Sequence, residues 1–269
     1  MNLVARPWLV IALLGSLTLS SATGKAGMTR AEVAEFEDYK AKAERGDAVS
    51  QVALGGCYGH GLGVARDKAL ALSWWRRAAE GGDAAAQYNL GFQYTTGEIL
   101  AEDQAQAILW WRKAAEQGFA LAQFSLGYRY FNGENVPKDK IEAAKLWRKA
   151  AEQGNVYAQL MLGLCYFKGD GVAKDSIEAA KWWHKAAEQG CLESNYRLAV
   201  CYEKGDGVVK DAIEAYARYK IAWEVTDLAR KNFATLEKKI TREARLKGLA
   251  RAKEIQEEII KNRKKKAGK

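Results

Sequence analysis

Residues 154–189 read GNVYAQLMLGLCYFKGDGVAKDSIEAAKWWHKAAEQ, and this stretch decides the fold because its pattern recurs in register along the chain. Five such cycles follow one another without a gap, each 36 residues long and each opening on a glycine. A period of this size is typical of stacked supersecondary units that contact only their neighbours. Positions are numbered from the first glycine of each cycle, and the cycles span 46–81, 82–117, 118–153, 154–189 and 190–225.

Four positions carry the same residue type in all five cycles. They are leucine at position 9, tyrosine at 13, glycine at 16 and aspartate at 22, which in the fourth cycle are Leu162, Tyr166, Gly169 and Asp175. Asn155 is a good N-cap, so residues 157–167 are predicted to form a first helix, which we call helix A. The glycine-rich turn after it separates helix A from a second helix, helix B, that starts at Asp175.

Helix B carries one apolar stripe, with alanines and tryptophans spaced i, i+3, i+4, i+7. The next cycle's glycine is expected to end this helix in the left-handed conformation. An acidic residue or glutamine follows the N-cap aspartate after three residues, which predicts a reciprocal capping box. These pairs are Asp103 with Gln106, Asp139 with Glu142, Asp175 with Glu178 and Asp211 with Glu214.

The repeat resembles the Sel-one-like repeat family, a relative of the tetratricopeptide repeat. Residues 84–91 (AAAQYNLG), 111–118 (WRKAAEQG) and 180–190 (AKWWHKAAEQG) carry the match, which extends over 46–225. The resemblance implies an all-α, right-handed α/α solenoid of five 36-residue helix-turn-helix repeats. Departures are local: the second cycle has Glu98-Ile99-Leu100 in its turn, the third has Asn135 where φ must be positive, and the fifth has Arg218 at an apolar position.

The chain outside the repeats predicts export and capping. Arg6 precedes an apolar run over 8–19 and then Ser20-Ser21-Ala22, so 1–22 is expected to be a signal peptide of a periplasmic or secreted protein. The run is shorter than the roughly 20 residues that span a bilayer, although an uncleaved anchor is the alternative. Residues 23–45 are expected to hold a linker and a capping helix that starts at Thr29 with Glu32 as a capping box.

Residues 226–269 are predicted to form two C-terminal capping helices, the second starting after Thr241, and a basic tail. Their expected apolar faces are Leu228, Phe233, Leu236 and Ile240, then Leu246, Leu249, Ala252, Ile255 and Ile259.

The net charge of +9 resides entirely in this C-terminal segment, which holds 15 basic and 6 acidic residues. The tail is expected to fray in solvent, and two interpretations stay open. It is a solvated helix end, or it contacts anionic lipid or polysaccharide. The residues concerned are Arg263, Lys264, Lys265 and Lys266.

The four cysteines are predicted to be free thiols. Cys57, Cys165 and Cys201 share position 12, and Cys191 occupies position 2. Equivalent positions in neighbouring repeats lie about a helix diameter apart, too far for a disulfide, whose Cα atoms must lie within about 7 Å. A bridge between Cys165 and Cys201 is the alternative.

The sequence favours no enzyme class. Its two histidines, His60 and His184, are far apart in the chain, and no phosphate-binding loop, zinc-peptidase motif or G-x-S-x-G motif occurs. No serine has lysine three residues on, which disfavours a β-lactamase-like hydrolase. The predictions are therefore no catalysis, no cofactor, no metal, no small-molecule substrate and no nucleic acid.

A binding function needs an accessible surface. In the related tetratricopeptide fold, helix A lines the concave groove, and by that resemblance positions 11 and 14 point into it. An aromatic groove would suit a peptide or protein partner, although these side chains could instead pack on the neighbouring helix. The candidates are Phe92, Tyr128, Phe131, Leu164 and Phe167. We therefore predict a non-catalytic interaction scaffold; the alternative is an envelope-associated structural protein that uses its basic tail.

Overall fold

The computed structural model of the chain describes residues 28–97, 102–223 and 227–267, with side chains as far as Lys265. The expected signal peptide at 1–22 and the irregular second turn at 98–100 lie outside the described residues.

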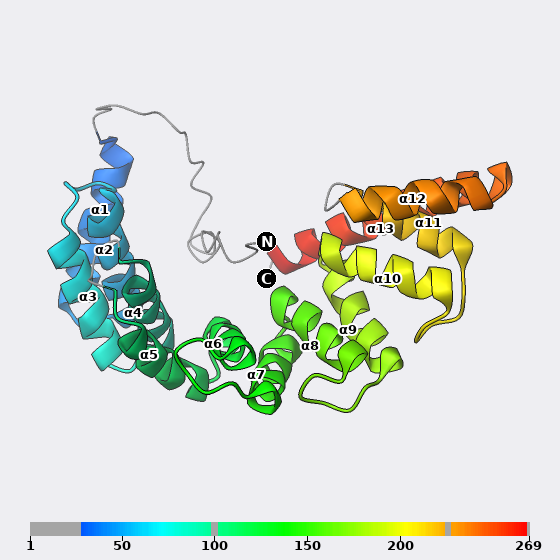
Figure 1. Cartoon of the computed structure of the whole chain (residues 1–269). Helices are drawn as coiled ribbons and strands as arrows, with labels where there is room; N and C mark the ends of the chain where they lie inside the picture. Colours follow the sequence, from blue (N-terminus) through cyan, green and yellow to red (C-terminus); the bar gives the residue numbers. More distant parts are fainter. Residues whose placement is uncertain (1–27, 98–101, 224–226, 268–269) are drawn as a thin grey trace.

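The described residues form thirteen helices and no strand. One helix precedes the repeats, five helix pairs follow, and two helices end the chain (Figure 1). The predicted all-α solenoid, capped by helices at both ends, is confirmed. The helices are α1 (Arg30–Glu44), α2 (Ala48–His60), α3 (Lys68–Glu80), α4 (Ala84–Thr96), α5 (Gln104–Glu116), α6 (Ala120–Asn132), α7 (Lys140–Glu152), α8 (Val156–Lys168), α9 (Ser176–Glu188), α10 (Leu192–Lys204), α11 (Ala212–Ile221), α12 (Asp227–Lys239) and α13 (Arg242–Ala267).

Capping sets the ends of the helices in each repeat. In the fourth repeat, the Asn155 side chain accepts a backbone N–H of the first turn of α8 at 2.9 Å, and Gly169 ends that helix with φ 79°. The Asp175 carboxylate accepts two backbone N–H groups at the start of α9. Gly190, the first residue of the next cycle, has φ 85°, as expected for a left-handed stop. Asn135, where a left-handed residue was expected, has φ 57°.

The reciprocal half of the capping box occurs only at Thr29 among the described helices. There, Glu32 accepts the Thr29 backbone N–H at 2.8 Å and the Thr29 hydroxyl accepts the Glu32 N–H at 3.2 Å. In α7 and α9 the prediction was wrong, because Glu142 and Glu178 pair with a lysine one turn further on. Such an i, i+3 pair on a helix surface contributes about 0.2–0.5 kcal/mol. Gln106 also lacks the reciprocal bond. Glu214 lacks it because its carboxylate binds two arginines instead.

A tryptophan of helix B packs directly on a glycine of helix A in each of the first four repeats. In the fourth, Trp183 is 1% exposed and its Nε1 donates to the backbone carbonyl of Leu160 at 3.3 Å. A Cβ built on Gly163 would lie 2.4 Å from that Nε1, so the two helices can approach this closely only at glycine. The equivalent pairs are Gly55 with Trp75, Gly91 with Trp111 and Gly127 with Trp147.

Neighbouring repeats are joined by hydrogen bonds at recurring positions. A buried glutamine at position 6 reaches back to the preceding helix B, as Gln159 Nε2 does to the Ala151 carbonyl at 3.0 Å. The residue at position 31 binds the hydroxyl of the tyrosine at position 13 in the next repeat. These contacts are Arg76 with Tyr94 (3.1 Å), Arg112 with Tyr130 (3.0 Å) and Arg148 with Tyr166 (2.6 Å).

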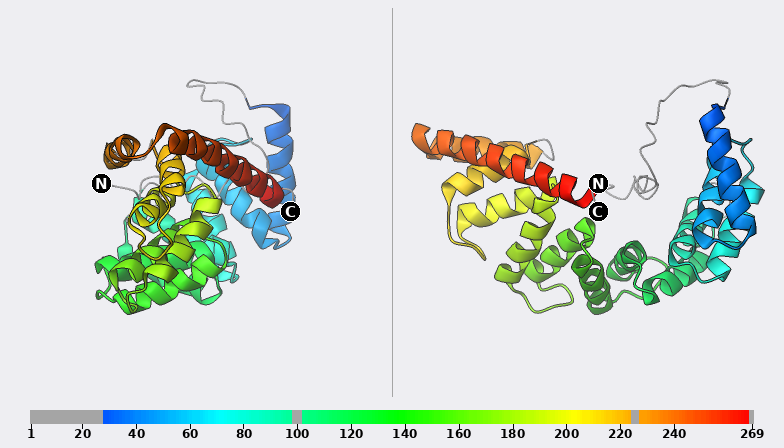
Figure 2. Two further views of the ribbon diagram at one scale, coloured as in Figure 1. Left: turned by 90° about the vertical axis from the view of Figure 1, so that its right-hand side faces the viewer. Right: turned by 180° about the vertical axis from the view of Figure 1, so that it is seen from behind.

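The stacked repeats curve into an open arc (Figure 1). The first helices of the central repeats, α4, α6 and α8, lie on the inside of the arc, whereas α7 lies on the outside. Helix α13 runs back from the end of the solenoid across α11 toward α9, as Figure 1 and the view from behind in Figure 2 show.

The terminal helices cover the last repeat differently from the prediction. Phe233 and Leu236 of α12 are buried, as are Ala252, Ile255 and Ile259 of α13. The expected contributions of Leu228, Leu246 and Leu249 were wrong, because these side chains are 55%, 59% and 42% exposed. Helices α12 and α13 each pack on α11, so only the face turned toward α11 is buried.

The basic tail is more ordered than predicted. Helix α13 continues to Ala267, and Arg263 donates to the backbone carbonyl of Gln189 at 3.2 Å. That carbonyl lies at the C-terminus of α9, where the helix dipole favours a cation. The expectation that residues from 261 onward fray in solvent was therefore wrong at Arg263.

All four cysteines are free, and three of them, Cys57, Cys165 and Cys201, are buried. The alternative of a bridge between Cys165 and Cys201 is thus excluded. Within the ranges that the structure describes, no helix combines the length and the hydrophobicity needed to cross a bilayer.

Candidate functional site

Positions 4, 8 and 11 of helix A carry no charged residue in the first four repeats, whereas position 15, one turn further on, holds the exposed Lys168 in α8. Positions 4, 8 and 11 of each helix A are half-buried or exposed. We call these residues together the concave stripe, because α4, α6 and α8 lie on the inner side of the arc (Figure 1). The stripe consists of Val49, Ala53, Gly56, Ala85, Asn89, Phe92, Leu121, Ser125, Tyr128, Tyr157, Met161 and Leu164. In a chain with 28% charged residues, an accessible surface without charge stands out from the rest.

The stripe ends at the fifth repeat. There, positions 4 and 8 are Glu193 and Arg197, which form an ion pair of 2.8 Å within α10. The uncharged surface is therefore bounded on one side by a charged helix.

The most accessible ring of the stripe is Tyr157, on the first turn of α8, which is 53% exposed. Its ring centroid lies 5.9 Å from that of Phe124 in α6, so the two rings bridge neighbouring repeats. Tyr128 and Met161 pack at their base against the buried core and are half-buried. The accessible aromatic and aliphatic groups are therefore held in place by their contacts with the buried core.

The sequence prediction named positions 11 and 14 as the contact surface, and the structure separates the two. Phe92, Tyr128 and Leu164, all at position 11, belong to the stripe. Phe131 and Phe167, at position 14, pack in a tilted arrangement against Trp147 and Trp183 of their own helix B, with ring centroids 5.2 Å and 5.5 Å apart.

Sequence reasoning missed position 4, which holds Val49, Leu121 and Tyr157. A helix residue shares a face with those four and seven positions further on. Position 4 therefore lies in line with positions 8 and 11, and this spacing together with the absence of charge could have identified it.

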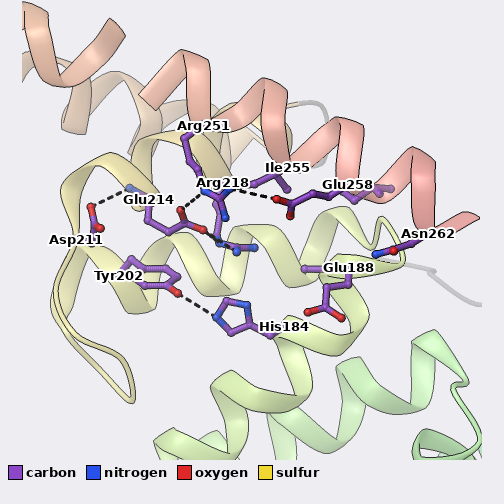
Figure 3. Close-up of a pocket in the computed structure, with 12 residues that line it drawn as sticks. His184, Glu188, Tyr202, Asp211, Glu214, Arg218, Arg251, Ile255, Glu258 and Asn262 are labelled. Atoms are coloured by element: carbon purple, nitrogen blue, oxygen red, sulfur yellow. Dashed lines mark hydrogen bonds and ion pairs between the residues drawn. The ribbon is translucent and has the colours of Figure 1, made fainter. Parts of the chain in front are cut away.

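A second candidate site is a polar cavity of about 300 Å³ between α9, α10, α11 and α13 (Figure 3). We call it the polar seam, since it lies where the repeats meet α13. Its polar lining residues are His184, Glu188, Tyr202, Asp211, Glu214, Arg218, Arg251, Glu258 and Asn262.

Two arginines share one carboxylate in the seam. Arg218 is 6% exposed, and its Nε donates to Glu214 Oε1 at 2.8 Å. Its Nη1 donates to Asn195 Oδ1 at 3.1 Å. Arg251 of α13 donates to the other carboxylate oxygen of Glu214 at 3.0 Å. Both oxygens of Glu214 are engaged, so this group fastens α13 to α11.

His184 lies at position 31, where the preceding repeats have arginine. Its Nε2 lies 3.1 Å from the Tyr202 hydroxyl and so preserves the contact between repeats. Burial, together with the Arg218 guanidinium, lowers the pKa of His184 to about 4. A neutral imidazole is thus placed where an arginine would repel Arg218.

The basic end of α13 lies beside the C-terminus of α9. A recess of about 410 Å³ is lined by Gly154 and Gln159 beside the first turn of α8, by Lys185 and Glu188 of α9, and by Asn262 and Lys265 of α13. The four residues predicted to contact an anionic surface differ in their environments. Arg263 is engaged by Gln189, Lys264 and Lys265 are exposed, and the side chain of Lys266 lies outside the described residues.

In the part of the chain that the structure describes, no group of three His, Cys, Asp or Glu side chains could hold a metal ion.

The sequence profile of the Sel1 repeat matches residues 48–83, 84–119, 120–155, 156–191 and 192–222. A similar solved structure is c5321, a protective antigen of uropathogenic Escherichia coli strains with an SLR fold, at 35% identity and a TM-score of 0.72. That match covers 84% of this chain and 48% of the antigen, so the chain spans about half the length of that relative. A Sel1 repeat protein from Oxalobacter formigenes matches at 33% identity and a TM-score of 0.69, over 83% of this chain and 99% of that one. No curated protein sequence matches the chain.

Proposed function

The chain belongs to the Sel1 repeat family, and from that premise we propose that it is a non-catalytic scaffold that holds a protein or peptide partner on its concave stripe. Sel1 repeat proteins are generally protein-interaction scaffolds, and their fold is typically non-enzymatic. The surface used and the nature of the partner are our proposal.

One observation carries this proposal: positions 4, 8 and 11 of four successive helices A are accessible and hold no charge. Solvent alone favours charged side chains at such positions, as the outer helix α7 illustrates with Lys145 and Lys149 exposed. An accessible surface that holds aromatic and aliphatic side chains and no charge is typical of a contact site.

The expected mode of binding is anchoring on a preformed surface. Tyr157, Tyr128 and Phe92 offer rings from three neighbouring helices, and the helices beneath them are fixed by the tryptophan core. Asn89, at position 8 of the stripe, offers hydrogen bonds to a partner backbone. Because the surface is already ordered, little conformational entropy is lost on binding.

We also propose that the chain is exported and that the partner is therefore an envelope or extracellular protein. The support is the sequence of residues 1–22. Cell fractionation and N-terminal sequencing of the mature protein test it, and a chain recovered from the cytoplasm with residues 1–22 intact would contradict it.

The contact surface is tested with a matched pair of arginine substitutions. Tyr157 in the stripe and Ile177 in helix B of the same repeat are 53% and 59% exposed, so neither change disturbs the core. We expect Tyr157→Arg to abolish capture of the partner from an envelope extract and Ile177→Arg to leave it unchanged, with identical circular dichroism. Equal capture by both variants would refute the stripe as the binding surface.

A further inference from the structure

Helix α13 carries two apolar rows, and the described residues cover one of them. The covered row, which includes Ile255 and Ile259, forms one buried cluster with α11. Leu246, Leu249 and Ile260 lie outside that cluster and are 59%, 42% and 52% exposed. Helix α11 has 10 residues and α13 has 26, so at about 1.5 Å per residue α11 spans less than half the length of α13. A second apolar row therefore remains accessible on α13.

The accessible apolar side chains alternate with basic ones along a single face of the helix. Residues spaced three or four apart share one face. The row that follows this spacing has seven exposed members, which include three cations and no carboxylate. These members are Arg242, Leu246, Leu249, Lys253, Gln256, Ile260 and Lys264. We call them the basic apolar row.

The whole of α13 is positively charged, with ten basic and four acidic residues. The four carboxylates lie on either side of the row or behind it, and each is within 4.0 Å of a basic side chain of the same helix. The charge that an approaching surface meets along the row is therefore positive.

We propose that the basic apolar row binds the surface of an anionic membrane. Leu246, Leu249 and Ile260 enter the boundary between the lipid headgroups and the acyl chains, as in helices that lie in the plane of a membrane interface. Arg242, Lys253 and Lys264 meet the lipid phosphates, and their long apolar stems let the charged ends stay at the headgroups. This contact is separate from the concave stripe, because it uses a different helix.

A flat surface can reach the row along its whole length. The view from behind in Figure 2 shows α13 running along the edge of the molecule, with no other helix in front of it. From Arg242 to Lys264 the row extends over about 33 Å of a continuous helix.

An anionic surface suits the row better than a second copy of this chain does. Pairing of two rows would bring cations against cations in a chain whose net charge is already +9. Like charges brought together in this way oppose association. A surface of anionic lipid turns the same charges into an attraction.

The row differs from the lipid or polysaccharide contact that the sequence predicted at residues 263–266. Of those four residues only Lys264 belongs to it, and Arg263 donates to the Gln189 carbonyl instead. The proposal thus assigns the contact to the length of α13 and makes it depend on the leucines near the start of that helix.

Cosedimentation of the full chain with vesicles tests the proposal. We expect stronger binding to phosphatidylglycerol than to uncharged phosphatidylcholine, and a decrease at high salt. Leu246→Ser/Leu249→Ser should lower the partition coefficient on phosphatidylglycerol by about tenfold, because it removes apolar groups from the interface. Arg242→Glu/Lys264→Glu should lower it by about twentyfold or more, since each cation near an anionic surface contributes about fivefold. Differences between variants report α13 alone, because all of them share residues 1–22.

The repeats supply matched controls for both changes. Ile141→Ser/Ile177→Ser alters two apolar residues that are 58% and 59% exposed on α7 and α9. Lys145→Glu/Lys181→Glu changes the net charge by the same amount as the α13 pair, at side chains that are 65% and 61% exposed. Both control variants should keep at least half of the vesicle binding.

Three outcomes would overturn the proposal. Equal losses in the α13 pairs and in their controls would reduce vesicle binding to unspecific attraction by net charge. Binding that Leu246→Ser/Leu249→Ser leaves unchanged would assign the contact to the cations alone, as on an anionic polysaccharide. A dimer in analytical ultracentrifugation that this leucine pair dissociates, with no binding to vesicles, would assign the row to a second copy of the chain. The stripe is tested independently through Tyr157, so its failure and the failure of this proposal are distinguishable.

Discussion

Two adjacent glycines in α2 give opposite predictions for the same substitution. A Cβ on Gly55 would lie 2.4 Å from Cδ1 and Nε1 of Trp75, a ring that is 5% exposed. A Cβ on Gly56 would have nothing within 4 Å. Both residues lie in the interior of the helix, so their intrinsic helix propensities are the same. The difference between Gly55→Ala and Gly56→Ala therefore reports the packing of Trp75 alone.

The magnitudes follow from three effects. Replacing glycine by alanine within a helix stabilises by about 0.5–1 kcal/mol, which is the whole effect expected for Gly56→Ala. At Gly55 the new methyl group must displace Trp75, and overpacking of this kind costs about 1–3 kcal/mol. Displacement also breaks the bond from Trp75 Nε1 to the Val52 carbonyl, which is 3.1 Å long. A buried donor left without a partner costs about 1–3 kcal/mol more, so Gly55→Ala should lower the unfolding free energy by about 2–4 kcal/mol.

Urea unfolding followed by far-ultraviolet circular dichroism and by tryptophan fluorescence measures both variants. The midpoint should rise for Gly56→Ala and fall for Gly55→Ala. Combining Gly55→Ala with Trp75→Leu should recover part of the loss relative to Trp75→Leu alone, because the smaller side chain vacates the clash. If the two alanine variants shift the urea midpoint in the same direction by similar amounts, the inference that Gly55 is required for the packing of Trp75 is refuted.

Three further predictions concern the C-terminal cap. His184 is neutral in the folded chain, with its pKa lowered to about 4, whereas the unfolded chain takes up that proton near pH 6.5; stability should therefore be full above about pH 6.5 and fall by about 2 kcal/mol toward pH 4. His184→Gln should flatten that part of the pH profile in thermal unfolding, and an unchanged profile would contradict the assignment. Arg251→Ala should lower the unfolding free energy by about 1–3 kcal/mol and accelerate amide hydrogen exchange in α13; slow exchange in that variant would show that the apolar contacts alone hold the helix. Arg263→Ala should accelerate exchange only after about residue 259, while Lys264→Ala, which removes an exposed cation of the same helix, should leave it unchanged.

Much of the fold could be predicted from the sequence because each repeat is specified locally. The N-cap residues Asn155 and Asp175 and the left-handed glycines act within one turn, so their positions in sequence give the helix ends directly. Helix α1 was found in the same way, from Thr29 and Glu32. The period then places the pairs relative to one another, since identical units must stack identically.

Features that depend on contacts between distant segments could not be predicted from the sequence. Leu246 and Leu249 continue the apolar spacing of α13, yet they lie beyond the face that α11 can cover. Arg263 reads as one member of a cationic run, and only the return of α13 to α9 gives it a hydrogen-bond acceptor 74 residues away in the chain. For the same reason, only part of the candidate site was predicted correctly, namely position 11 and not position 14. Position 11 is accessible in every repeat, but whether the rings at position 14 face solvent or the tryptophans depends on how closely the two helices pack.

The departures of the fifth repeat from the pattern have one physical cause, which is that a different helix packs against it. Positions 28 and 32 are Lys181 and Lys185 in the fourth repeat, where they are exposed, and Ala217 and Ile221 in the fifth, where both are buried. Those two residues form one cluster with Ala252, Ile255 and Ile259 of α13.

Arg218 then occupies the position of Trp182 and reaches the carboxylate that Arg251 also binds, which in turn requires a neutral His184 in place of arginine. Moved to the end of the fourth repeat, α13 would set Ile255 and Ile259 against two lysines. The cap is therefore specific for the fifth repeat.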